Sequence, residues 1–241
     1  MTAPLPLIVV NASTVCTDDE IRHYVAALQM FMPEFCRAWA LPEVDVGFMP
    51  HGQRIPDGFW VQVVADTSDQ AGALGYHETR HNVPIGYTFA KTGRAAGSSV
   101  SGTLSHEVWE MLADPYIDLQ ITEPATGRRW DVENADAVEA DEYAIRWPMP
   151  SGPDVLLSDF VFPSYFNFSA PEGVAYDYRR LLMQPIPAML PGGYLAYQEP
   201  NGRWGQISAF ESRLAAAKAR PSPLSRRYRR MFDVWQESEL A

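Results

Sequence analysis

One long stretch of this sequence, from Ala95 to Gly127, contains no lysine or arginine. The same stretch carries several carboxylates: Glu107, Glu110, Asp114, Asp118 and Glu123. A solvated helix face usually mixes charges of both signs, since like charges at positions i and i+4 repel. The missing positive charge favours a bound cation here, and a solvated acidic face is the alternative.

Cysteines are scarce and long apolar runs are missing. Cys16 and Cys36 are the only cysteines; they could form one disulfide, but nothing else has the pattern of an exported scaffold. The first residues lack the basic segment and long apolar core of a signal peptide, and no stretch approaches the length of a membrane span. We expect a cytoplasmic protein with reduced thiols, or one carried on a phage particle.

Composition favours a loop-rich α+β protein. The 241 residues can bury a sizeable core, 46% of them are hydrophobic, and there are 20 prolines. The net charge of −11 argues against a nucleic-acid surface over most of the fold. We expect a main domain over 1–203 and a basic helical extension over 204–241. Only the cluster Arg226–Arg230 could dock on nucleic acid, an anionic lipid surface or the acidic body of the protein itself. A solvated helical tail is the other interpretation.

The segment from Ser105 to Pro115 predicts a helix with potential metal ligands along one side. At about 100° per residue, Glu110 falls about 40° from His106, and Glu107 falls about 100° from it. The apolar residues of the segment point the opposite way and would anchor the helix in a core. An imidazole and a carboxylate at i and i+4 can share one divalent metal.

A second acidic segment, 130–142, follows the helix and contains six carboxylates. It could supply the third ligand of the metal, a separate oxygen-rich calcium site, or only a solvated loop. Glu133 and Asp136 are the first candidates for the third ligand. Asp114 is the next, because it stands about 12 Å from His106 along a straight helix. It could reach the same ion only if the helix ends or bends at Pro115, and would otherwise orient His106 or a backbone group.

Together, the two segments resemble a known group of proteins. The order Ser-His-Glu-x-x-Glu-x-x-x-Asp-Pro at 105–115, then Trp130, then Glu133, Asp136 and Glu139 is similar to zincin-like, uncharacterised phage and bacterial proteins. The plant phosphate-induced, exordium-like proteins have a similar pattern, and the run 157–166 resembles the phage-type members. The resemblance implies an α+β, zincin-like domain in which a mixed sheet packs on the active-site helix.

The resemblance also implies a function. It predicts a metal-dependent hydrolase, a metallopeptidase above all, with Zn²⁺ bound by His106 and Glu110 and with Glu107 as general base. Better-known zincins have a histidine in place of Glu110, and a carboxylate shifts the preference towards Ca²⁺ or Mn²⁺. The alternatives are a non-catalytic module in which the ion is structural, and an accessory protein of a phage.

Further candidates concern the substrate. Zincins hold an extended peptide on an antiparallel edge strand, and the candidate strand is 83–90, with Tyr87 and Phe89. Tyr143 or Tyr165 could stabilise an oxyanion, although core packing is the commoner role of such tyrosines. His77 and His81 would meet only on a helix, and the neighbouring Gly75 and Pro84 favour strand or loop. We therefore place both histidines outside the main site.

The remaining pattern predicts the order of elements. Strands are expected at 7–10, 44–49, 59–65, 83–90, near 132, at 143–147 and at 154–162. Helices are expected at 17–39, with a capping box of Thr17 and Glu20 and a kink or interruption at Pro33, and at 207–219 and 225–237. The segment 93–102 reads as a connection, 148–153 as a turn and 170–203 as irregular.

Overall fold

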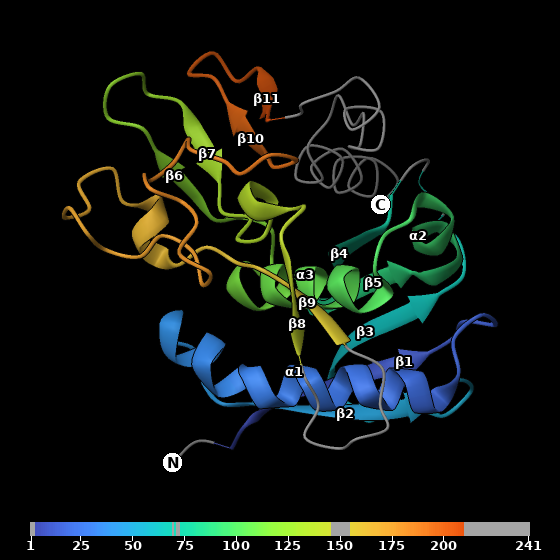
Figure 1. Cartoon of the computed structure of the whole chain (residues 1–241). Helices are drawn as coiled ribbons and strands as arrows, with labels where there is room; N and C mark the ends of the chain where they lie inside the picture. Colours follow the sequence, from blue (N-terminus) through green and yellow to red (C-terminus); the bar gives the residue numbers. More distant parts are fainter. Residues whose placement is uncertain (1–2, 69, 71–72, 146–154, 210–241) are drawn as a thin grey trace.

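A five-stranded mixed sheet supports the site. The computed structural model describes residues 3–68, 70, 73–145 and 155–209. The sheet consists of β1 (Leu5–Asn11), β2 (Val44–Pro50), β3 (Trp60–Ala65), β4 (Gly75–Arg80) and β5 (Val83–Phe89), in the order β2-β1-β3-β5-β4. Its inner pairs are parallel, and β4 runs antiparallel to β5 at the edge (Figure 1). With the helices, this mixed sheet confirms the α+β class.

Within the described residues, three α-helices accompany the sheet: α1 (Asp18–Ala38), α2 (Ala90–Ala96) and α3 (Val100–Ala113). The helix α1 begins as predicted, because the Thr17 side chain accepts a hydrogen bond from the N–H of Glu20, a cap that stabilises a helix by about 1 kcal/mol. The prediction of an interruption at Pro33 is wrong, since α1 continues through it and forgoes only the bond that a proline nitrogen cannot donate. The segment 93–102, expected to be a connection, is largely helical: α2 covers 93–96, and α3 begins at Val100.

Helices α1 and α3 share one core with the sheet. This core contains Leu7 and Val9 of β1, Phe35 of α1, and Leu104 and Trp109 of α3. The alternate residues Ile8 and Val10 face a smaller apolar group on the other side of the sheet. The predicted apolar stripe of α3 is therefore confirmed as its anchor.

A two-stranded hairpin lies against the other side of α3. Its strands are β8 (Glu142–Ile145) and β9 (Val155–Ser158), and the expected turn between them lies outside the described residues. The Ser105 hydroxyl accepts a hydrogen bond from the N–H of Ser158, and the Trp109 indole donates to the Ser158 carbonyl. These two contacts fix α3 to β9.

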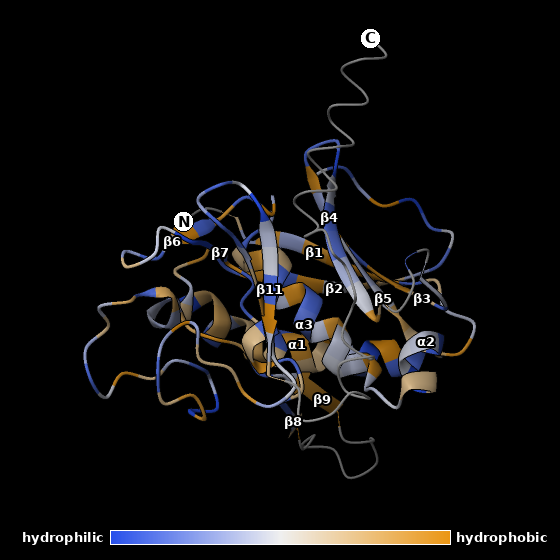
Figure 2. Ribbon diagram, turned by 90° about the horizontal axis from the view of Figure 1, so that it is seen from above, coloured by the Kyte–Doolittle hydropathy of each residue, from blue (hydrophilic) through white to orange (hydrophobic). Residues whose placement is uncertain are grey.

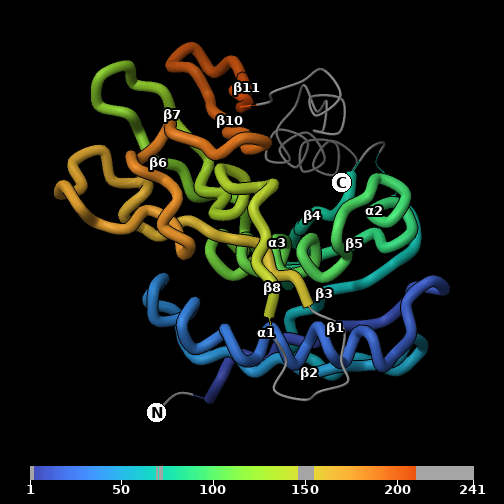
Figure 3. Tube along the Cα trace, in the orientation of Figure 1, coloured from blue at the N-terminus to red at the C-terminus, as the bar shows by residue number. Residues whose placement is uncertain are grey.

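A second, antiparallel sheet lies beside α3, as the tube in Figure 3 shows. It consists of β6 (Gln120–Thr122), β7 (Arg129–Asp131), β10 (Tyr194–Gln198) and β11 (Trp204–Ser208), in the order β11-β10-β7-β6, and the 3-10 turns η1 (Asp136–Val138) and η2 (Pro163–Phe166) lie near it. The segment 170–203 was expected to be irregular, which is wrong at β10. A helix was expected from Ile207, which is wrong at β11, because Ile207 lies in this strand. Strand β11 pairs with β10 across the predicted domain boundary. Most of the predicted extension, including Arg226–Arg230, lies outside the described residues.

The segment around His77 forms the edge hairpin. Strands β4 and β5 are joined by the two residues His81 and Asn82, both with positive φ, as in the tight turns that match the twist of a hairpin. The predicted edge strand 83–90 is instead an inner strand, because β4 covers its outer side. Strand β4 is the antiparallel edge strand of the sheet.

Helix α3 is enclosed, including its polar side. Figure 2 shows hydrophilic stretches within this central helix, surrounded by other elements. His106 is 7% exposed, Glu107 1% and Glu110 0%. The alternative of a solvated acidic face is therefore wrong. In the described part of the chain, none of the helices has the length and apolar character needed to cross a bilayer.

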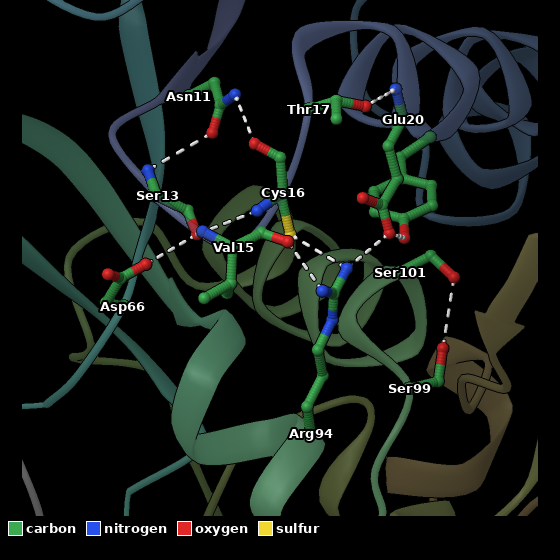
Figure 4. Close-up of polar contacts among 11 residues, drawn as sticks. Asn11, Ser13, Val15, Cys16, Thr17, Glu20, Asp66, Arg94, Ser99 and Ser101 are labelled. Atoms are coloured by element: carbon green, nitrogen blue, oxygen red, sulfur yellow. Dashed lines mark hydrogen bonds and ion pairs between the residues drawn. The ribbon is translucent and has the colours of Figure 1, made fainter.

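A polar network joins the loop after β1 to the sheet and to α2 (Figure 4). Asp66, just after β3, accepts hydrogen bonds from the Ser13 and Thr14 hydroxyls. Arg94 of α2 donates to the Val15 carbonyl and to Glu20. Cys16 in this loop is a free thiol, as is Cys36.

The Asp66 contacts predict a pH-dependent stability. The two hydroxyls lower the pKa of Asp66 from 3.8 to about 2. The stabilisation is therefore present above pH 3.8 and is lost as the pH falls towards 2. We expect Asp66→Asn to lower the urea midpoint of unfolding at neutral pH, and the difference from the parent to shrink in acid. Asp57→Asn, in the exposed loop before β3, is the control, and a pH-independent difference for Asp66→Asn would contradict the account.

Candidate metal centre

Three side chains converge at the middle of α3. His106 Nε2 lies 3.1 Å from Glu110 Oε1 and 3.5 Å from Asp136 Oδ1. The three ligand atoms lie within 4.8 Å of one another, and all three residues are buried. The i, i+4 spacing on α3 brings His106 and Glu110 together, and η1 supplies Asp136. The group is close enough to hold a metal ion, as the spacing predicts for His106 and Glu110.

The other nitrogen of His106 meets a further carboxylate. His106 Nδ1 lies 3.2 Å from Glu139 Oε2, just after η1. A histidine that gives its Nδ1 proton to a carboxylate keeps the lone pair of Nε2 for a metal. Glu139 is therefore close enough to orient the ring. It belongs to the acidic pattern of the sequence, but the sequence alone assigned it no role.

Negative charge is in excess in this group, and the pKa values of His106 and Glu110 show its effect. Burial alone would lower the pKa of His106, but Glu110 and Glu139 outweigh it and hold that pKa well above 6.5. Burial raises the pKa of Glu110 to about 8, and the neighbouring charge of Asp136 adds to the rise. Both shifts have one physical cause, which is negative charge gathered in a buried space.

A second group adjoins the first. His77 Nδ1 lies 3.9 Å from Glu107 Oε2 and 3.8 Å from Glu110 Oε2, and these residues also lie close enough to hold an ion. The placement of His77 outside the main site is therefore wrong. Its spacing from His81 suggested a helix, whereas strand alternation turns Gly75, His77 and Thr79 of β4 towards α3. His81 lies in the exposed hairpin turn.

Asp114 belongs to neither of the two groups of described residues that could hold an ion. Helix α3 ends at Ala113, and the Asp114 carboxylate accepts hydrogen bonds from the N–H groups of Asp118 and Leu119. Its carbonyl accepts a hydrogen bond from His77 Nε2 at 3.3 Å. Asp114 therefore fixes the chain after the helix and orients His77, which matches the backbone role considered as the alternative.

The acidic segment after β7 is largely buried. Asp131, Glu133 and Asp136 are all less than 10% exposed. A solvated loop is therefore excluded for these three residues. Asp136 belongs to the His106 group, whereas Glu133, the other candidate ligand, stands three residues earlier and belongs to neither of the two groups found among the described residues.

The candidate tyrosines lie in packed aromatic groups. Tyr87 pairs with Tyr76 across the β4–β5 hairpin, so its ring, like that of Phe89, lies on the face of the sheet opposite to His77. Tyr143 packs between Phe31 and Tyr178, at centroid distances of 5.6 and 5.2 Å. The Tyr165 hydroxyl donates to the Ala188 carbonyl, and its ring lies in a second apolar core with Trp130 and Leu195.

A pocket of about 60 Å³ reaches the metal-binding groups. Its lining comes from β4, α3, β8 and the segment after η1, and includes Gly75, His106, Glu107, Glu139 and Glu142. The pocket therefore joins the edge strand to one proposed ligand, His106, and to the proposed base, Glu107.

Comparisons with protein-family models, with curated proteins and with solved structures gave no match to this chain. The function proposed below therefore rests on the residues and geometry of the site.

The contact between Glu139 and His106 predicts an effect on metal affinity. Removal of a carboxylate that orients a metal-binding histidine commonly costs about 10–100-fold in affinity. We expect Glu139→Ala to weaken zinc binding by this factor in competition with a chromophoric chelator. Glu172→Ala, at an exposed loop position, is the matched control. Unchanged affinity in Glu139→Ala would show that Glu139 does not position the ring.

Proposed function

We propose that the protein is a metal-dependent hydrolase with a zincin-like site, and that it acts on peptide bonds. The observation that carries the proposal is the convergence of His106, Glu110 and Asp136 in a buried group beside Glu107, at a pocket that reaches His106 and Glu107. A metal site that serves only stability needs neither a further carboxylate beside it nor an opening to a pocket.

His106, Glu110 and Asp136 would hold the ion. One imidazole and two carboxylates form a ligand set that zinc accepts in hydrolases, with a position left for water. A bound zinc ion lowers the pKa of its water and polarises a carbonyl group. Zinc is the proposed metal. Manganese and calcium are the alternatives, because two oxygen ligands make this site harder than the two-histidine site of the better-known zincins.

Glu107 would act as the general base. It directly follows His106 on α3, is 1% exposed and lines the same pocket. From this place its carboxylate can accept a proton from the attacking water and pass it to the leaving amine.

Strand β4 would hold the substrate. It is the antiparallel edge of the sheet as far as the chain is described, and its Gly75 lines the pocket next to Glu107. The outer backbone groups of an edge strand can pair with an extended peptide. This replaces the sequence-based assignment of peptide binding to 83–90, since β5 lies inside the sheet.

Replacement of Glu107 tests the proposal. We expect Glu107→Gln to lose about 10²–10⁴-fold in peptide hydrolysis, because general-base catalysis contributes about that factor. The His106 group should keep its metal, measured by elemental analysis after dialysis. The assay uses the zinc-loaded full chain and a mixture of peptides analysed by mass spectrometry.

The matched control is Glu43→Gln, at an exposed position before β2. If the parent binds metal but cleaves no peptide, and removal of the metal only lowers its unfolding temperature, the ion has a structural role. That role is the second candidate, and its support is that the His106 group ties α3 to η1. The predicted phage association and the docking role of Arg226–Arg230 remain predictions.

A further inference from the structure

We infer that His77, Glu107 and Glu110 form a second divalent-cation site, which shares Glu110 with the His106 site to make a two-ion centre. The inference rests on the proposed function for its first ion. It goes beyond that function, because it assigns a ligand from the edge strand β4 and predicts a different metal content.

His77 reaches the centre from the sheet. It lies in the middle of β4, its side chain is fully buried, and its Nδ1 faces Glu107 Oε2 and Glu110 Oε2. The two distances, 3.9 and 3.8 Å, are too long for hydrogen bonds. Two atoms that bind one zinc ion at about 2.0–2.2 Å lie at most about 4.4 Å apart, so both distances are compatible with a shared ion. The three residues are close enough together to hold one.

The contact of the other nitrogen of His77 fixes the orientation of the ring. His77 Nε2 lies 3.3 Å from the Asp114 carbonyl oxygen. A carbonyl oxygen can only accept, so Nε2 is the donor in this contact, and Nδ1 is the nitrogen that faces the two carboxylates. A backbone carbonyl that fixes the second nitrogen is also typical of histidines that bind metals.

Glu110 is placed to bridge the two sites. Its Oε1 lies towards His106 and its Oε2 towards His77. The residue is fully buried, and both metal-binding groups contain it. One carboxylate between two ions is the usual connection in two-metal hydrolytic sites. A single ion at His106 would leave Glu110 Oε2 facing His77 and Glu107 with no cation on that side.

Gly75 leaves room for the second site. A methyl group at this position would lie 2.5 Å from Glu107 Oε1 and 2.8 Å from the Tyr87 carbonyl oxygen. Only glycine allows β4 to approach α3 so closely. Glu107 therefore turns Oε2 towards His77 and keeps Oε1 beside β4, so that ligand and base use different oxygens. The nitrogen and carboxylate ligands suit Zn²⁺ or Mn²⁺.

Metal content tests the inference. The full chain is loaded with Zn²⁺, dialysed and analysed for zinc per protein. We expect about two equivalents in the parent and about one in His77→Ala. The control is His51→Ala, at an exposed turn after β2, which should keep about two.

The outcomes separate this inference from the proposed function. About one equivalent in both the parent and His77→Ala would overturn the second site and leave the first. No zinc in the parent would overturn both. In case His77→Ala fails to fold, the parent alone is loaded with Mn²⁺ and studied by electron paramagnetic resonance. The spectrum of an exchange-coupled pair supports the bridge through Glu110, whereas that of isolated ions overturns it.

Discussion

The need to neutralise buried negative charge governs this structure. Glu107 and Glu110 lie inside the molecule on one turn of α3, and Asp136 faces them from η1. An ionised carboxylate taken out of water costs several kcal/mol unless a positive charge compensates it. Two histidines approach these carboxylates, and each has an acceptor oxygen close to its other nitrogen. A divalent cation would balance this charge and would suit the orientation of both rings.

The fold brings these groups together from separate parts of the chain. The sheet supplies His77 on its antiparallel edge, α3 supplies the central residues, and the segment around η1 supplies Asp136 and Glu139. The hairpin β8–β9 fixes α3 through Ser158, and Asp114 fixes the chain where the helix ends. The same arrangement leaves a pocket beside β4. The packing around α3 therefore both holds the charged side chains in place and leaves the pocket through which they can be reached.

The sequence predicted what depends on local periodicity. The inner strands, the Thr17 cap and the ligand pair His106 and Glu110 follow from the spacing of neighbouring residues. It could not predict β10 and β11, because a proline- and glycine-rich segment forms strands here only when a partner strand, β7, is available. His77 was missed for the same reason. Its role depends on the pairing of β4 with β5, which turns it towards a helix about thirty residues further along the chain.

The central claim is that a divalent cation balances the carboxylates at Glu110. The most direct measurement is a crystal structure of the zinc-loaded protein, with anomalous data collected on both sides of the zinc absorption edge. The account predicts anomalous density among His106 Nε2, Glu110 and Asp136. An ordered His106 and Glu110 without such density would contradict it, and would leave a proton on His106 as the compensating charge.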